Sequence, residues 1–197
     1  MKDRTYLLKF CVTALFAALA YVAFTFLKIN IPTPGGYTAF HLGNTFCVLA
    51  ALLLGGVPGG IAGAVGMGIG DVLDPLYITV APKTIILKMC IGLVTGAVAH
   101  RIFHINKLEG RKLVVAVIVS ASAGMLFNIV GEPLFGYFYT SVILGAPAKA
   151  AEKLAAFNAI TTTVNAVLAV IISSSLYLAL YKQFKKNGTL QKIAPKE

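Results

Sequence analysis

Three charged side chains, Asp71, Lys88 and Glu132, occur within or at the ends of long apolar stretches of this chain. A charged residue inside a membrane span costs about 3 kcal/mol on insertion, so it normally faces the interior of a helix bundle and marks a site. With amides and hydroxyls beside them, such charges could bind a polar small molecule. The accompanying residues are Asn44, Asn128, Asn158, Thr162 and Asn165.

Structural roles are the alternative for the same residues. Asp71 and Lys88 could pair only with each other, and Glu132 could be interfacial. The amides and the hydroxyl could simply join helices by hydrogen bonds.

The composition places these residues in a membrane protein. Hydrophobic residues make up 58% of the 197 residues and charged residues 12%, and the mean hydropathy is +0.84. Soluble domains carry roughly 25% charged residues. The net charge of +10 would suggest nucleic-acid binding in a soluble chain. Here the basic residues lie at the ends of apolar stretches, so membrane orientation explains them and no nucleic-acid partner is expected.

Six apolar stretches predict six membrane-spanning helices, since about 20 apolar residues cross the hydrocarbon layer. The predicted fold class is an all-α integral membrane protein with one six-helix bundle. Residues 1–184 are predicted to form this substrate-binding domain, and residues 185–197 a basic, solvated cytoplasmic tail. The segments between spans are expected to be loops. The predicted spans are 6–27, 44–54, 59–73, 84–103, 113–134 and 154–181.

The distribution of lysine and arginine predicts the orientation. Six spans place both termini on one side, where twelve of the 17 basic residues lie, against four on the other side and Lys88 within a span. By the positive-inside rule both termini are cytoplasmic. The twelve are Lys2, Arg4, Lys9, Arg101, Lys107, Arg111, Lys112, Lys182, Lys185, Lys186, Lys192 and Lys196.

With this orientation, the polar residues of five spans lie at one depth. Asn44 begins the second span, Asp71 ends the third, and Lys88 lies about one turn into the fourth from outside. The others occupy the outer and middle turns of the fifth and sixth spans, whereas the inner half is nearly all aliphatic residues and glycine. A mostly apolar cavity with a few placed polar groups is typical of a small-molecule site. We therefore expect such a cavity in the outer half.

Residues 55–71, GGVPGGIAGAVGMGIGD, contain eight glycines and raise the question of a phosphate-binding loop. The Walker pattern G-x-x-x-x-G-K-[ST] is absent. Instead Gly56, Gly60, Ala64 and Gly68 recur every four residues, a spacing that lets helices approach closely in a membrane. This predicts a closely packed helix that carries Asp71 to the mouth of the cavity.

The sequence lacks the patterns of common catalytic and metal sites. His100 and His104 are four residues apart, but no carboxylate or cysteine completes a metal shell, and H-E-x-x-H is absent. There is no nucleophile elbow and no nucleotide-binding fingerprint. We therefore expect no enzyme activity, no metal and no cofactor bound by this chain. If the protein transports a molecule, the energy would come from a partner.

Two sequence features resemble the substrate-binding S component of an energy-coupling factor (ECF) vitamin transporter. The first span reads TALFAALAYVA, similar to the A-x-x-x-A signature of that family at Ala14 and Ala18. The run FHLGNTFCVLAALLLGGVPGGIAGAVGMGIGDVLDP, followed by KTIILKMCIGLVTGAVAH, is similar to the riboflavin-type branch, which includes transporters for hydroxymethylpyrimidine and vitamin B6. The resemblance extends over essentially the whole chain.

The resemblance implies that Ala14 and Ala18 contact a membrane-embedded T component, which is joined to two ATPases that use ATP. It implies a prokaryotic cell membrane and a bundle that topples to carry its cavity inward. The outer loops 32–42 and 74–83 would act as lids. Tyr37 and His41 suit a lid, because an aromatic ring can stack on a flat ligand and bind its edge. An interfacial aromatic belt is the alternative.

The polar set favours a small ring with hydroxyl, amine or phenolate groups, such as vitamin B6 or hydroxymethylpyrimidine. The absence of tryptophan argues against a thiamine-type site built on indole stacking. Riboflavin or another B vitamin stays open. Two other classes also stay open: an autonomous oligomeric secondary transporter, and an intramembrane enzyme that uses Asp71 or Glu132.

Overall fold

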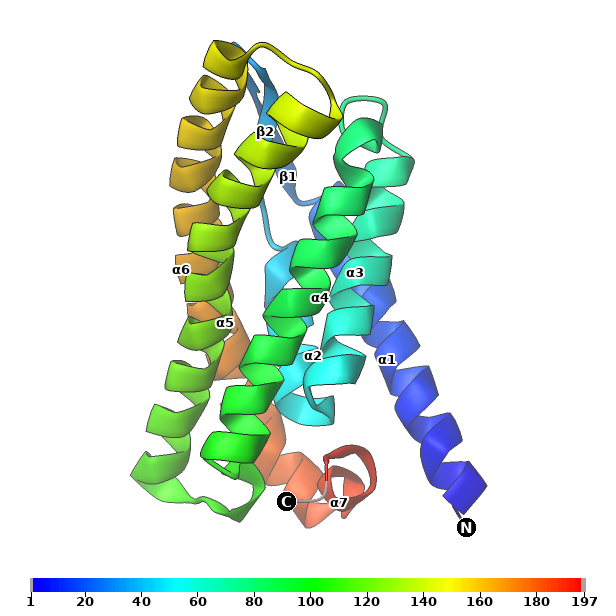
Figure 1. Cartoon of the computed structure of the whole chain (residues 1–197). Helices are drawn as coiled ribbons and strands as arrows, with labels where there is room; N and C mark the ends of the chain where they lie inside the picture. Colours follow the sequence, from blue (N-terminus) through cyan, green and yellow to red (C-terminus); the bar gives the residue numbers. More distant parts are fainter. Residues whose placement is uncertain (1, 196–197) are drawn as a thin grey trace.

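The computed structural model describes the backbone of residues 2–195 and the side chains of residues 5–195. Lys2, Arg4 and Lys196, which were counted for the orientation, therefore lie outside the described side chains. Over these residues the molecule is a bundle of long helices with a small two-stranded sheet at one end (Figure 1). The helices of the bundle are α1 (Lys2–Thr25), α2 (Gly43–Leu54), α3 (Gly56–Val72), α4 (Ala81–Ala97), α5 (Gly110–Phe138) and α6 (Ala148–Lys186).

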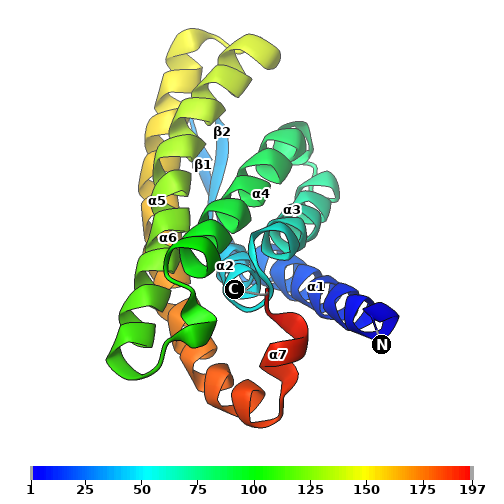
Figure 2. The ribbon, with the colours of Figure 1, turned by 60° about the horizontal axis from the view of Figure 1, so that its bottom comes forward.

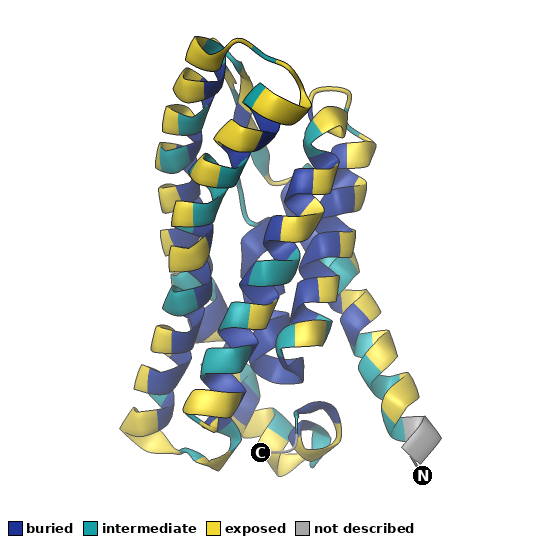
Figure 3. Ribbon diagram, in the orientation of Figure 1, coloured by how far each residue is buried: buried dark blue, intermediate teal, exposed yellow. Residues whose placement is uncertain are grey.

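Four of the described helical stretches are long and apolar enough to cross a membrane: Thr5–Thr25, Ile78–Ile102, Gly110–Ile143 and Ala148–Lys186. The stretches at α4 and α5 include the short helical turns η1 (Ile78–Val80), η2 (Val98–Ile102) and η4 (Tyr139–Ile143). α2 and α3 have 12 and 17 residues, and nearly all of α2 is buried among the other helices (Figure 3). The chain is thus a multi-pass helical bundle, and six complete spans stay a prediction.

The glycine-rich stretch forms α3, as its spacing predicted, and packs closely on α4. A Cβ atom on Gly92 would lie 2.1 Å from the backbone nitrogen of Gly60, and one on Gly96 would lie 2.1 Å from that of Gly56. Backbone therefore touches backbone along the crossing of the two helices. Only glycine allows this approach, because any side chain there would separate the helices.

The segment between α1 and α2 is an antiparallel hairpin of β1 (Lys28–Thr33) and β2 (Gly36–His41), with Lys28 opposite His41 and Thr33 opposite Gly36. The prediction that this segment is a loop is wrong, although the rest of the described bundle is helical, as the predicted fold class requires. Two six-residue runs separated by two turn residues are a hairpin signal. The prolines and glycines of this segment are equally typical of a loop.

The C-terminal segment also differs from the expectation of a solvated tail. α6 continues to Lys186, and α7 (Thr189–Ile193) folds back so that Leu190 and Ile193 are buried. Figure 2 shows α7 at the end of the bundle where α1 begins. The Lys9 ammonium group donates to the Ala194 carbonyl over 3.2 Å. The segment therefore packs on the bundle as far as residue 195, and residues 196–197 lie outside the description.

Candidate functional site

A cavity of about 670 Å³, including its open mouth, lies at the end of the bundle that carries the hairpin. It is lined by β2, by the segment after α3 and by side chains from all six helices of the bundle. All ten residues predicted to bind substrate line it, although whether they bind one stays a prediction. They are Tyr37, His41, Asn44, Asp71, Lys88, Asn128, Glu132, Asn158, Thr162 and Asn165.

Four charged side chains converge on this cavity: Asp71, Lys83, Lys88 and Glu132. Glu132 forms an ion pair with Lys83, and both side chains are mostly buried. Lys83 was expected in an outer loop, but α4 begins at Ala81 and turns it inward. The ion pairs of the described residues include no pair between Asp71 and Lys88, so the expectation that they could pair directly is not met.

Three buried oxygens at the cavity have no hydrogen-bond partner among the described residues. They are Oδ1 of Asn44, Oδ1 of Asp71 and Oδ1 of Asn128, and each of these residues is 1% exposed. A buried polar atom without a partner costs about 1–3 kcal/mol. Because the three belong to α2, α3 and α5, a ligand with donor groups on several edges could satisfy all of them.

Asn165 lines the cavity and also makes contacts to the hairpin that the sequence did not predict. Its Oδ1 accepts the His41 backbone N–H over 3.1 Å, and its Nδ2 donates to the Ala39 carbonyl over 3.0 Å. One turn earlier on α6, the hydroxyls of Thr161 and Thr38 lie 2.7 Å apart. These contacts fasten β2 to α6, so Asn165 positions the hairpin that covers the cavity.

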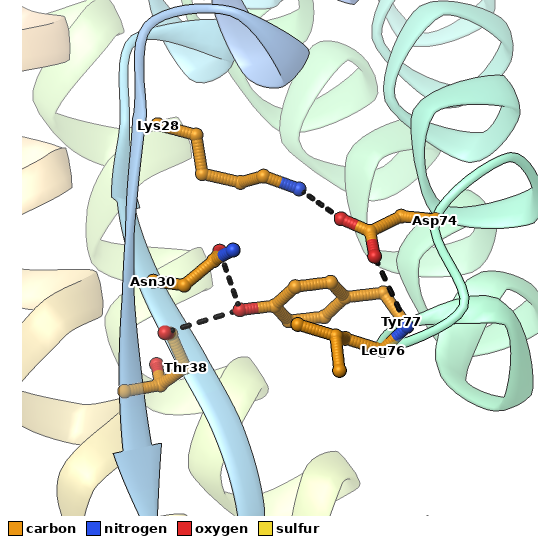
Figure 4. Close-up of polar contacts among 6 residues, drawn as sticks. All are labelled: Lys28, Asn30, Thr38, Asp74, Leu76 and Tyr77. Atoms are coloured by element: carbon orange, nitrogen blue, oxygen red, sulfur yellow. Dashed lines mark hydrogen bonds and ion pairs between the residues drawn. The ribbon is translucent and has the colours of Figure 1, made fainter.

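The hairpin and the loop before α4, the two segments expected to act as lids, contact each other directly (Figure 4). The Lys28 ammonium group lies 2.5 Å from Oδ2 of Asp74. The Tyr77 hydroxyl donates its proton toward Oδ1 of Asn30 at 3.0 Å and the Thr38 carbonyl at 3.1 Å. The Lys28 ammonium group also lies 4.7 Å from the centre of the Tyr77 ring. We call Lys28, Asn30, Asp74 and Tyr77 the latch.

The groups of these two segments are held in defined protonation states. Burial, followed by the positive charges of Lys88 and Lys28, lowers the pKa of His41 well below 6.5. Its Nδ1 accepts the Gly43 N–H over 3.2 Å, so the neutral ring carries its proton on Nε2. Burial opposes ionisation of Asp74, but its hydrogen bond and attraction to Lys28 hold the pKa of its carboxyl below 3.8. At neutral pH the Asp74 carboxylate is therefore ionised and His41 is uncharged.

The other residues singled out from the sequence lie apart from the cavity. Ala14 and Ala18 are both exposed on α1, four residues apart and therefore on one face. His100 is buried, with Nε2 3.2 Å from the Ala51 carbonyl, whereas His104 is exposed. The described residues contain no group of three or more His, Cys, Asp or Glu that could hold a metal ion.

A helical membrane bundle with a polar cavity under two linked segments is the architecture of a membrane protein that binds a small molecule. The chain belongs to the family of the ECF-type riboflavin transporter S component, whose sequence model matches residues 6–182. It is therefore a transporter S component and not an enzyme, as the resemblance implied. No curated protein sequence matches the chain.

One solved structure shares the fold. ThiT from Listeria monocytogenes superposes with a TM-score of 0.62 and 18% sequence identity, and the match covers 96% of this chain and 99% of that one. At this identity the likeness concerns the fold alone.

Proposed function

We propose that this S component binds vitamin B6 or hydroxymethylpyrimidine in the cavity beneath the hairpin. The charge balance of the lining carries the proposal. Asp71 and Glu132 supply two negative charges, Lys83 and Lys88 supply two positive charges, and His41 is neutral, so the net charge is zero. Such a lining favours a neutral or zwitterionic ring over a ligand with a large net charge.

The polar atoms of the cavity fit the edges of such a ring. The unpartnered oxygens of Asn44, Asp71 and Asn128 can accept hydrogen bonds from hydroxyl or amino groups. Lys88, which makes no ion pair with the described residues, can donate to a phenolate or a ring nitrogen. The Tyr37 ring, which lines the cavity from the hairpin, can stack on a flat ligand.

In this proposal the bundle topples in a prokaryotic cell membrane to deliver its ligand. Both termini lie in the cytoplasm, which the excess of basic residues at that end supports. The chain binds no cofactor itself, and ATP is used by two ATPases joined to a T component. The exposed pair Ala14 and Ala18 supports docking of the T component, because small residues let helices approach closely.

Riboflavin is the second candidate ligand, because the matching family is described as a riboflavin transporter S component. Riboflavin is also flat, neutral and rich in hydroxyl groups. It differs from the first candidates in size, so direct competition between the ligands separates the two.

The deciding experiment identifies the vitamin that the purified full chain retains. The protein is denatured, the extract is analysed by mass spectrometry, and pyridoxine, hydroxymethylpyrimidine, riboflavin and thiamine are then titrated into empty protein. We expect pyridoxine or hydroxymethylpyrimidine to bind best, and Lys88→Gln to weaken binding while the exposed-site variant Lys153→Gln does not. Preference for the thiamine cation would contradict the charge argument. Uptake by vesicles that contain this chain alone would indicate the autonomous transporter.

A further inference from the structure

A second cavity lies at the opposite end of the bundle, between the start of α5 and the end of α6. Its wall is apolar where it faces the bundle, and its rim is basic. The wall residues are Leu113, Val114 and Leu178, and the rim residues are Lys182, Lys185 and Lys186. The vitamin cavity uses none of these side chains.

The rim carries more positive charge than its own acidic residue neutralises. Glu109 lines the cavity and pairs with Lys185, and both side chains are largely exposed. An exposed pair of this kind contributes little stability. The ion pairs of the described residues include neither Lys182 nor Lys186. Three lysines against one glutamate leave a net charge of +2 at this rim, which suits an anion.

An apolar groove lies on the same two helices, further along the bundle. Met125, Leu126 and Ile129 of α5 and Val167 and Val170 of α6 line it. Helix rise places Met125 about 18 Å from Leu113 along α5. This distance is comparable with the length of one extended fatty acyl chain. The basic rim and the groove therefore have the spacing of a headgroup and its chain.

We propose that the α5–α6 face binds an anionic phospholipid lengthwise, with its phosphate at the lysine rim and one acyl chain in the groove. A free phosphate ester would use only the rim, and a neutral lipid would use only the groove. An anionic phospholipid satisfies both, and a basic cluster at the membrane surface attracts anionic headgroups.

Native mass spectrometry of the full chain tests this proposal with three probes at equal concentration: phosphatidylglycerol, phosphatidylcholine and glycerol 3-phosphate. We expect phosphatidylglycerol to be retained at least tenfold better than either of the others. The triple variant K182Q/K185Q/K186Q is expected to lose this preference, because each lysine near an anionic surface contributes roughly fivefold. The double variant K149Q/K153Q, with exposed lysines at the hairpin end, is expected to keep it.

A second variant tests the acyl chain. Val167→Trp fills the groove from a half-exposed position, and Leu168→Trp adds the same bulk next to it. Only the first is expected to reduce lipid retention, and thermal unfolding verifies that both are folded. Equal retention of the two lipids, tight binding of glycerol 3-phosphate alone, or an unaffected lysine variant would each overturn the proposal.

Discussion

Asp71 is a buried carboxylate with one oxygen that no described group satisfies. We expect Asp71→Asn to weaken vitamin binding about 10- to 100-fold, because a hydrogen bond to a charged group contributes about 1.5–3 kcal/mol. We expect the melting temperature to hold or rise, since the variant removes a buried charge. Titration calorimetry and thermal unfolding measure the two effects. Unchanged affinity would return Asp71 to a purely structural role.

Asn165 is bonded to the hairpin, so its variant is expected to change the mobility of the hairpin as well as vitamin binding. Asn165→Ala removes two hydrogen bonds to β2, each worth about 1 kcal/mol. We expect roughly tenfold weaker vitamin binding and faster hydrogen exchange of the His41 amide. Thr163→Ala is the control, because the Thr163 hydroxyl bonds only within its own helix. Weaker binding with unchanged exchange would mean that Asn165 contacts the ligand directly.

The depth of polar residues in apolar stretches predicted eight of the side chains that line the cavity, whereas Tyr37 and His41 were expected as part of a lid and Lys83 was missed. The partner of each side chain was not predictable in the same way. Lys83 reaches Glu132 because α4 begins at Ala81, and helix starts are poorly defined by sequence. The contact between Thr38 and Thr161 depends on a strand that was not predicted at all.

The hairpin makes the covering of the cavity sensitive to pH through His41. Burial under the hairpin lowers the pKa of this imidazole. The neutral ring therefore stabilises the covered cavity above about pH 6.5, and this stabilisation is lost as the pH falls below that value. We expect vitamin affinity to fall about tenfold between pH 7.5 and 5.5. Asp74 adds nothing in this window, because its pKa lies below 3.8.

Two variants separate the effect of His41 protonation on vitamin affinity from the effect of protonation of the vitamin itself. His41→Gln keeps an acceptor for the Gly43 N–H. We expect vitamin affinity to depend less on pH in this variant than in the wild type. His104→Gln, at an exposed position, is expected to leave the profile unchanged. Identical profiles for wild type and His41→Gln would contradict the assignment.

The close packing of α3 was predicted from the sequence, since rows of glycine at four-residue spacing let membrane helices approach closely. That α4 is its partner was not predicted. Gly92→Ala would place a methyl group against the backbone of Gly60, which cannot yield. We expect a loss of several kcal/mol in stability, beyond the usual 1–3 kcal/mol of overpacking. Gly131→Ala would meet only side chains, the end of Leu87 at 3.3 Å and the Phe127 ring at 3.6 Å, and should change the melting temperature little.

At the scale of the whole molecule, the exposed pair Ala14 and Ala18 on α1 lies apart from the cavity. We expect Ala14→Trp or Ala18→Trp to abolish uptake by the complete transporter while leaving vitamin affinity unchanged, because the bulky ring would block helix docking. Val130→Trp, at an exposed position on α5, is the control. Uptake in reconstituted vesicles and calorimetry on the isolated chain measure the two properties. Loss of vitamin affinity in the α1 variants would contradict the assignment of Ala14 and Ala18 to docking alone.

The latch joins the hairpin, which lines the cavity through β2, to the segment after α3, which lines it through Tyr77. Widening this end of the cavity requires both segments to move apart, which breaks the Lys28–Asp74 ion pair and the Tyr77 hydrogen bonds together. The residence time of a bound vitamin therefore depends on how often the latch opens, and not only on contacts inside the cavity. Two ligands of equal affinity would then be released at similar rates, and capture from dilute solution would be slow to reverse.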